Sequence, residues 1–379
     1  MTSSIRTAGL RAAAEAALIL AVGMGFGRFA FTAVLPHMVE EGVITLQQGS
    51  LAASANYAGY LLGAFVAVRA RARHAHRLCL WSVVATALCL AVLALPLPTW
   101  GIVAVRGIAG ALSAMSMVAA SLWLLEHRGH FRGAPLLYAG VGIGIALSAE
   151  TLVLAAHAGL HSSGMWLVLG IASLVVGLAA APGLLASADR PAAVPDAPAS
   201  TAQAQIAAWP LTVVYGLAGL GYIVTATYLP TLVHSALPGL DPAHVWAVFG
   251  LGAVPSCFVW HRVHERLGTR RAMQLNLLVQ AVGVALPTLS GSVASYVLSA
   301  LLVGGTFTGA VTIAVPAAQR VARRTGKNLV ATLTLFYGIG QIAGPVLVEV
   351  LRAHGNGLSS SLLAATAVLL VAALLASRI

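Results

Sequence analysis

The chain has 379 residues, of which 59% are hydrophobic and 8% are charged, and its mean hydropathy is +0.91. Because a soluble domain is about a quarter charged, this composition excludes a water-soluble fold and predicts a protein that lies within a lipid bilayer. The formal net charge of +11 at pH 7 does not indicate a nucleic-acid partner, because the basic residues lie in short segments between the apolar runs.

Twelve apolar segments are predicted to cross the bilayer as helices, since a spanning helix needs about 20 mostly apolar residues. None of them shows the alternating pattern of a β-barrel strand. The predicted spans are, in chain order, 12–36, 46–68, 78–96, 99–125, 133–157, 164–185, 208–233, 243–261, 272–290, 292–319, 328–351 and 359–377. The sequence therefore predicts an all-α polytopic membrane protein of twelve transmembrane helices.

The distribution of basic residues predicts the orientation. Almost all of the 21 Lys and Arg residues fall on one side of the membrane if both termini lie in the cytoplasm. The loops on the other side contain no basic residue before Arg352. This bias predicts a multi-pass protein of the bacterial inner membrane with both termini inside. The basic loops also favour contact with anionic membrane lipids.

Two stretches of similar pattern indicate an internal repeat. "GFGRFAFTAVLPHM" begins at Gly25 and "GLGYIVTATYLPTL" begins at Gly219, and each has Gly-x-Gly, seven residues and Leu-Pro. Gly110 and Gly304 are separated by the same offset. We therefore expect two pseudo-symmetric six-helix halves, 1–185 and 208–379. The segment 186–207 between them is rich in Ala, Pro and Ser and is predicted to be a cytoplasmic linker.

Three charged residues fall well inside predicted spans, away from the span ends, where ionisable groups usually face a cavity or pair with one another. Arg28 lies in the first stretch, at the place where the second has Tyr222. Counted from the outer ends of their helices at about 1.5 Å per residue, Arg28, Arg106 and Glu150 lie at a similar depth. Two interpretations remain open from the residues alone.

In the structural interpretation, Arg28 and Glu150 form an ion pair and Arg106 binds backbone carbonyls. In the functional one, the arginines offer donors to an anionic substrate such as a carboxylate, because two arginines face one acid at this depth. Glu150 is then the candidate proton-coupling residue, since its charge depends on whether Arg28 is engaged elsewhere. Glu349, by contrast, is expected to pair with Arg352 at the outer rim.

Several motifs resemble those of the major facilitator superfamily. They are "ERLGTRRAM" at 265–273, "RGIAGALSA" at 106–114 and "GIGQIAGP" at 338–345. The matching loop of the first half lacks the acidic residue, and the Gly-Pro motif lies in helix eleven rather than helix five, so it does not establish antiport. "GFGRFAFTAVLPHM", "ANYAGYLLGA", "GLGYIVTATYLP" and "GIGQIAGP" together resemble the bacterial YbfB/YjiJ-type subgroup. The resemblance implies two halves that rock about a central site.

The same resemblance implies that helices one and four line the central cavity. Candidate substrate-binding residues are therefore Arg28, Arg106, Asn56, Tyr57, Tyr60, Tyr222, Thr225, Thr306, Tyr337 and Gln341. Each of the uncharged ones could equally make a hydrogen bond between helices. Five glycines are better interpreted as close-packing positions than as a phosphate loop: Gly25, Gly27, Gly140, Gly142 and Gly144.

The sequence predicts a secondary active transporter that moves a small anionic or amphipathic organic solute by alternating access, coupled to protons. The alternatives are a drug or metabolite efflux antiporter and, from another class, a non-transporting membrane sensor or a membrane enzyme. An enzyme should show a cluster of reactive residues at one membrane face, and none is evident. We expect no catalytic residues, no cofactor, no metal site and a monomer.

Overall fold

The computed structural model describes residues 2–186, 207–325 and 329–379, which are almost entirely helical. The elements are α1 (Thr2–Leu20), η1 (Ala21–Phe29), α2 (Ala30–Glu40), α3 (Leu46–Ala67), η2 (Ala72–His74), α4 (Ala75–Leu93), α5 (Thr99–Ser121), η3 (Leu122–His127), η4 (Phe131–Gly133), α6 (Ala134–His157), α7 (Ser162–Leu185), α8 (Ala208–Ala236), α9 (Pro242–Leu289), α10 (Val293–Thr325), α11 (Leu329–Ala353), α12 (Leu358–Leu375) and η5 (Ala376–Arg378). The predicted linker at 186–207 lies, except for its two end residues, outside the described residues.

Ten helices are long and apolar enough to cross a membrane in the described part of the chain, which confirms a multi-pass helical membrane protein. α3 is not among them, although it has 22 residues and no charged side chain, because its glutamine, asparagine and tyrosine residues lower its hydropathy. It still forms a regular helix, which begins at a capping box made by Thr45 and Gln48.

α9 contains two of the predicted spans. Its 48 residues would reach about 72 Å as one straight helix, more than twice the hydrocarbon thickness of a bilayer. The two helical parts meet at a kink at Gly268, whose φ of 74° and ψ of 172° suit a residue without a side chain. The count of twelve transmembrane helices stays a prediction.

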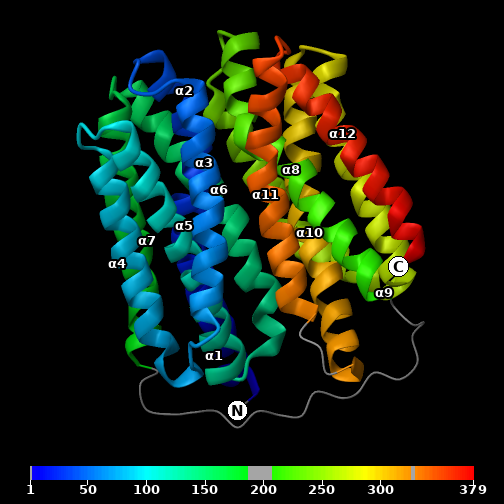
Figure 1. Cartoon of the computed structure of the whole chain (residues 1–379). Helices are drawn as coiled ribbons and strands as arrows, with labels where there is room; N and C mark the ends of the chain where they lie inside the picture. Colours follow the sequence, from blue (N-terminus) through cyan, green and yellow to red (C-terminus); the bar gives the residue numbers. More distant parts are fainter. Residues whose placement is uncertain (1, 187–206, 326–328) are drawn as a thin grey trace.

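The helices form two groups that lie side by side (Figure 1). We call α1–α7 the N-terminal bundle and α8–α12 the C-terminal bundle. They meet where α6 packs against α9, α3 against α11 and α2 against α8. We call the end of the molecule opposite the N-terminus the outer end, since the sequence predicts that the N-terminus faces the cytoplasm.

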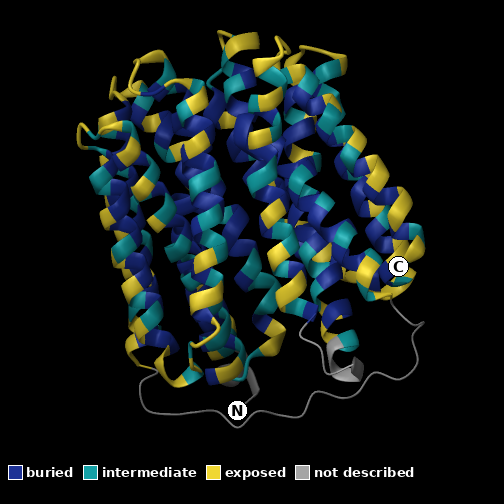
Figure 2. Cartoon of the chain, viewed as in Figure 1, coloured by how far each residue is buried: buried dark blue, intermediate teal, exposed yellow. Residues whose placement is uncertain are grey.

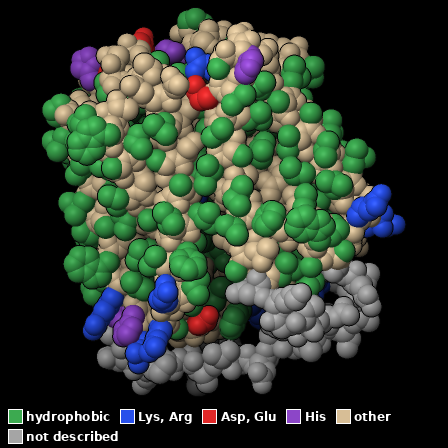
Figure 3. Space-filling view, in the orientation of Figure 1, with side chains coloured by type: hydrophobic (Ala, Val, Ile, Leu, Met, Phe, Trp, Pro, Cys, Tyr) green, Lys and Arg blue, Asp and Glu red, His purple; other side chains and the backbone are tan. Residues whose placement is uncertain are grey.

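The surface around the sides of the two bundles is apolar. Figure 2 shows buried residues along the inward faces of the helices, and Figure 3 shows hydrophobic side chains over the middle of the visible face with Lys and Arg gathered mainly near its lower end. Large hydrophobic residues more than 60% exposed include Leu62, Phe65, Trp100, Leu154, Leu178 and Leu374. Such a surface is stable in hydrocarbon and would aggregate in water.

The first span is π-helical in its middle. In η1 the helix widens, and the N–H of Ala30 donates to the carbonyl of Gly25, five residues back. Neighbouring helices approach this segment closely: a Cβ added at Gly25 would overlap the backbone of Gly144, and one at Gly144 would overlap Ala21. The close-packing interpretation of these glycines is therefore confirmed. Because π-helical turns are rare and often lie at functional sites, the segment marks a candidate site.

Candidate functional site

Arg28 lies at the end of the π-helical segment and is 3% exposed. The central carbon of its guanidinium lies 4.2 Å from the ring centre of Tyr60 and 5.1 Å from that of Tyr57, both on α3. It also lies 5.3 Å from the ring of Phe29. Three aromatic faces therefore stabilise the cation.

The guanidinium has donors to spare. Its Nε and Nη2 atoms are buried and have no hydrogen-bond partner in the described part of the chain. Within the same residues, no carboxylate lies within ion-pair distance of Arg28. A buried charge without an ion-pair partner is costly, and the two free nitrogens can donate hydrogen bonds to an acceptor that reaches them.

A row of stacked rings from the C-terminal bundle lies beside Arg28. Successive ring centres are 4.4, 5.8, 5.3, 5.4 and 4.4 Å apart. We call this row the aromatic ladder, and its members in order are Tyr215, Tyr337, Tyr222, Phe307, Phe249 and Trp246.

The ladder connects to the N-terminal bundle. Phe29 lies 6.0 Å from Phe307 between ring centres. Phe307 in turn stacks on Tyr222 at 5.3 Å, and Tyr222 stacks on Tyr337 at 5.8 Å. The structure thus brings together four residues that the sequence analysis proposed as binding residues: Arg28, Tyr60, Tyr222 and Tyr337.

Arg106 has a different environment. Its Nη1 donates to the carbonyl of Gly27 at 3.0 Å and its Nη2 to that of Arg28 at 2.9 Å. The guanidinium lies 4.4 Å from the ring centre of Phe31, and the residue is 1% exposed. This geometry supports the interpretation of Arg106 as a carbonyl-bound residue that positions the segment carrying Arg28.

Asn56 and Thr306 join neighbouring helices. The amide of Asn56 donates to the carbonyl of Arg106 at 2.8 Å. Thr306 receives a bond from Gln280 at 3.2 Å, and its own carbonyl accepts from Asn276 at 3.0 Å. For these two residues, the interhelical hydrogen bonds expected as the alternative are present.

The remaining candidates lie between the bundles or on the inner face of the C-terminal bundle. The hydroxyl of Tyr57 shares a 2.8 Å hydrogen bond with Thr227 of α8. Gln341 donates to the hydroxyl of Tyr222. The Gln341 Oε1 and Thr225 Oγ1 atoms are buried and make no hydrogen bond to any described residue. Both are therefore available to a ligand.

The expected pair of Arg28 and Glu150 is wrong for this structure. The Glu150 side chain is 51% exposed, and its Oε1 lies 3.1 Å from Nδ1 of His244 on α9. Counting residues along a helix estimates a depth, but it does not fix the direction in which a side chain points. Glu150 thus meets the C-terminal bundle, and Arg28 is left without an acid.

The expected rim pair of Glu349 and Arg352 is confirmed, with 3.3 Å between Oε1 and Nη1. The carboxylate also accepts from Ser50 of α3 at 2.7 Å, and the hydroxyl of Tyr228 on α8 donates to Ser50 at 2.7 Å. We call Tyr228, Ser50 and Glu349 the outer latch. It joins the two bundles at the outer end.

We expect Ser50→Ala to loosen the outer end, because the substitution leaves two polar groups without their shared partner. A hydrogen bond is worth about 1 kcal/mol, so the population of outer-open molecules should rise about fivefold. The measurement is the labelling rate of a cysteine introduced at Thr32, a residue that donates across the bundles to the carbonyl of Ala226 at 2.9 Å. Ser173→Ala is the control, since Ser173 bonds only within α7; equal labelling in both variants would contradict the latch.

A second polar cluster lies at the kink of α9, between the predicted spans 243–261 and 272–290. His264 shares a 2.9 Å hydrogen bond with Thr269, and Arg320 of α10 donates to Thr269 at 3.1 Å. Burial, and then the charge of Arg320, lowers the pKa of His264 to about 4. The histidine is therefore neutral at pH 7.

The free energy of unfolding should decrease as the pH is lowered below about 6.5, the ordinary pKa of histidine. The reason is that His264 of the unfolded chain then binds a proton, whereas His264 of the folded protein does not bind one until about pH 4. Melting temperatures from pH 7 to pH 4 measure the effect. His264→Gln should flatten this dependence, whereas His354→Gln, a change at an exposed residue, should not. Equal slopes in the wild type and His264→Gln would contradict the prediction.

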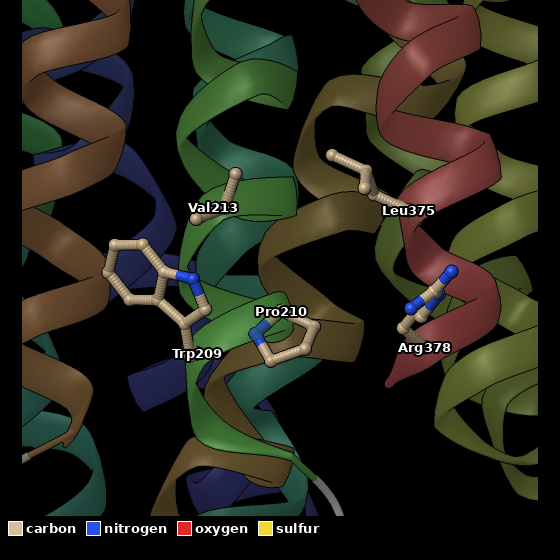
Figure 4. A pocket seen from close by; sticks show the side chains of 5 residues that line it. All are labelled: Trp209, Pro210, Val213, Leu375 and Arg378. Carbon is tan, nitrogen blue, oxygen red and sulfur yellow. The ribbon is translucent and has the colours of Figure 1, made fainter.

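A surface pocket of about 160 Å³ lies between the start of α8 and the end of α12 (Figure 4). Its lining residues are Trp209, Pro210, Val213, Leu375 and Arg378. An exposed tryptophan beside an arginine is typical of the membrane–water interface. We interpret the pocket as a lipid-facing surface, separate from Arg28.

Sequence reasoning missed most of the aromatic ladder. Only Tyr222 and Tyr337 were expected, because each has a hydroxyl. Trp246 and Phe249 lie three residues apart in the sequence and so share a helix face. That spacing, in a chain with 6% aromatic residues, was the available signal.

Comparisons with known proteins agree with this architecture. Residues 20–377 match the family described as "Uncharacterised MFS-type transporter YbfB". A bacterial homologue of the human lysosomal transporter Spinster, in an inward-facing and unoccupied conformation, is similar with a TM-score of 0.67 and 13% identity, covering 97% of each chain. The nucleoside transporter NupG, solved as a point variant, gives 0.68 and 15% identity over 96% of this chain and 98% of its own. No curated protein matches the chain.

Proposed function

Because the chain belongs to the YbfB-type family of the major facilitator superfamily and is thereby a secondary transporter, we propose that it moves a small organic anion across the bacterial inner membrane, coupled to protons. The observation that carries the proposal is Arg28, a buried guanidinium with two vacant donors and no acidic partner among the described residues. A structural arginine has its donors bound within the protein, as the two Nη atoms of Arg106 are bound by backbone carbonyls. A substrate-binding one must leave that place open.

We also propose that the two bundles are the repeated halves of an alternating-access transporter. Equivalent glycines support this. A Cβ at Gly110 would overlap the carbonyl of Asn56, and one at Gly304 would overlap the carbonyl of Phe249. The same close approach thus occurs once in each bundle, between the helices that the repeat relates.

Three contacts between the bundles favour a conformation that is closed at the outer end. The outer latch, the Tyr57–Thr227 bond and the Thr32–Ala226 bond all join the bundles at or outward of Arg28. The similarity to an inward-facing transporter is in keeping with that state. An anion would then reach Arg28 from the cytoplasmic side or leave towards it.

In our proposal Glu150 couples transport to protons through its contact with the C-terminal bundle, and not through an ion pair with Arg28. Glu150 contacts His244 of the other bundle, so the protonation of Glu150 weakens an attraction between the bundles rather than freeing Arg28. Glu150→Gln mimics the protonated acid. It should still exchange substrate across the membrane but should not concentrate it when only a pH gradient is present.

The test of the proposed function begins with thermal unfolding of the purified protein in the presence of organic acids and their neutral amides. A ligand that binds only the folded form raises the melting temperature. Acids should stabilise the protein and the amides should not. Acids that bind are then followed into proteoliposomes with and without a pH gradient. Stabilisation by neutral or cationic solutes alone would overturn the anion proposal.

A further inference from the structure

The number of free cations near Arg28 limits the charge of the substrate. Arg106 has both Nη atoms on backbone carbonyls and only its Nε without a partner among the described residues, so Arg28 is the guanidinium that offers two adjacent free donors at this place. One negative charge neutralises it. A dianion would place its second carboxylate without a bidentate donor, because the carbonyls occupy both Nη atoms of Arg106, and a buried charge that lacks hydrogen bonds is strongly unfavourable.

The vacant atoms of Arg28 define the kind of anion. Nε and Nη2 lie on one edge of the guanidinium, and their N–H bonds point the same way. A carboxylate accepts both bonds at once, and a bidentate pair of this kind is planar. The body of the substrate therefore begins in the plane of the guanidinium.

The surroundings of that edge are aromatic on both sides of the bundle interface. The N-terminal bundle supplies Tyr60, whose ring centre lies 4.2 Å from the central carbon of the Arg28 guanidinium. The C-terminal bundle supplies Tyr222 and Tyr337, which are stacked on one another at 5.8 Å. Phe29, beside the guanidinium, connects to them through Phe307, which stacks on Tyr222 at 5.3 Å. Aromatic rings pack favourably on other rings in offset or edge-to-face arrangements.

We propose that the substrate is a flat aromatic monocarboxylate, bound by Nε and Nη2 of Arg28 and packed against Tyr60, Tyr222 and Tyr337. This rests on the proposed function and names the substrate class of the same site. One bundle supplies the charge and the other supplies the aromatic ladder. Such a ligand contacts both bundles and links its own binding to their relative movement.

Four probes test the proposal with the full-length protein in detergent: benzoate, cyclohexanecarboxylate, benzamide and phthalate. Cyclohexanecarboxylate keeps the charge and ring size but is neither flat nor aromatic, benzamide is flat and neutral, and phthalate is a flat dianion. Calorimetry and melting temperatures measure binding. Benzoate should bind at least about tenfold more tightly than each of the other three.

Variants of Tyr222 test whether its ring causes the preference for benzoate over cyclohexanecarboxylate. Tyr222→Leu should reduce the ratio of benzoate to cyclohexanecarboxylate affinity towards one, whereas Tyr222→Phe keeps the ring and should keep the ratio. Tyr296→Leu removes a buried tyrosine of α10 that contributes to none of the ring pairs above and serves as the control. Binding of cyclohexanecarboxylate by the Leu variants shows that they are folded.

The outcomes separate this proposal from the proposed function. Equal affinity for benzoate and cyclohexanecarboxylate, lost in Arg28→Met, would overturn the aromatic class and leave an anion transporter. Equal affinity for benzoate and phthalate would overturn the single charge. If neither acid binds, or if Arg28→Met binds them normally, both proposals are wrong.

Discussion

Arg28→Met is expected to weaken binding of the substrate strongly and at the same time to raise the melting temperature of the ligand-free protein. Methionine fills a similar volume without bringing a charge into the bilayer. Losing one partner of a buried charge pair costs about 2–5 kcal/mol, which weakens binding by roughly thirtyfold or more. Removing an unpaired buried charge should stabilise the free protein by at least about 1 kcal/mol, even after the loss of the contacts with Tyr57 and Tyr60.

Arg106→Met is the matched control, and it should lower the melting temperature of the ligand-free protein instead of raising it. That substitution leaves the carbonyls of Gly27 and Arg28 buried without their donor, at a cost of about 1–3 kcal/mol each. Thermal unfolding of the two variants in detergent measures both effects. If Arg28→Met lowers the melting temperature as much as Arg106→Met does, Arg28 is a structural residue.

Arg28→Lys separates charge from shape. Lysine keeps the positive charge but is a point donor without a planar fork. We expect binding to weaken about tenfold and the gradient-driven accumulation of substrate to fall in proportion. Normal transport by this variant would show that the fork of Arg28 is not used.

The sequence predicted the helical membrane fold and the position of Arg28, because both follow from periodic and local signals. Apolar runs of the right length predict spans, and a charge within one is conspicuous whatever the tertiary structure. The replacement of Arg28 by Tyr222 at the repeated position also pointed to an asymmetric site. In the structure the two residues are connected through the rings of Phe29 and Phe307.

Residue counting failed where the direction of a side chain decided the result. Depth along a helix follows from its rise per residue, but rotation about the axis depends on packing. α6 is apolar on all sides, so nothing in its sequence indicated that Glu150 is half-exposed and points towards α9 while the neighbouring Ala149 is fully buried. The π-helical segment likewise shifts the face on which Arg28 lies, and its wide turn has no simple sequence signature.

Contacts between distant segments were also beyond prediction. The two Nη atoms of Arg106 are ordinary donors in the sequence, and only the fold brings them to the carbonyls of Gly27 and Arg28. The aromatic ladder is assembled from four helices for the same reason. In both cases the residue type was visible and the partner was not.

Substitution of the glycines at the repeated close approaches should cause large losses of stability. Gly110→Ala and Gly304→Ala each place a methyl group on a backbone carbonyl of the neighbouring helix, that of Asn56 or of Phe249. A backbone contact cannot be relieved by rotating a side chain, so the helices must separate. Overpacking of this kind costs about 1–3 kcal/mol or more.

Each substitution has a control in the same contact. A Cβ at Gly107 lies 3.6 Å from the carbonyl oxygen of Ala55, and one at Gly305 lies 3.6 Å from that of Gly252, which are ordinary distances. Gly107→Ala and Gly305→Ala should therefore be neutral or slightly stabilising, because alanine favours a helix by up to about 1 kcal/mol over glycine.

Melting temperatures of the four variants in detergent test the close approaches and the internal repeat together. If the bundles are repeats, the losses in Gly110→Ala and Gly304→Ala should be similar. Gly110→Ala should also weaken binding at Arg28, because it displaces Asn56 and with it Tyr57 and Tyr60 on the same helix. Gly304→Ala displaces Phe249 of the aromatic ladder, so it should reduce the preference for an aromatic acid while sparing the affinity for its saturated counterpart. Tolerance of alanine at Gly304 but not at Gly110 would mean that the two bundles are not built on the same helix contact.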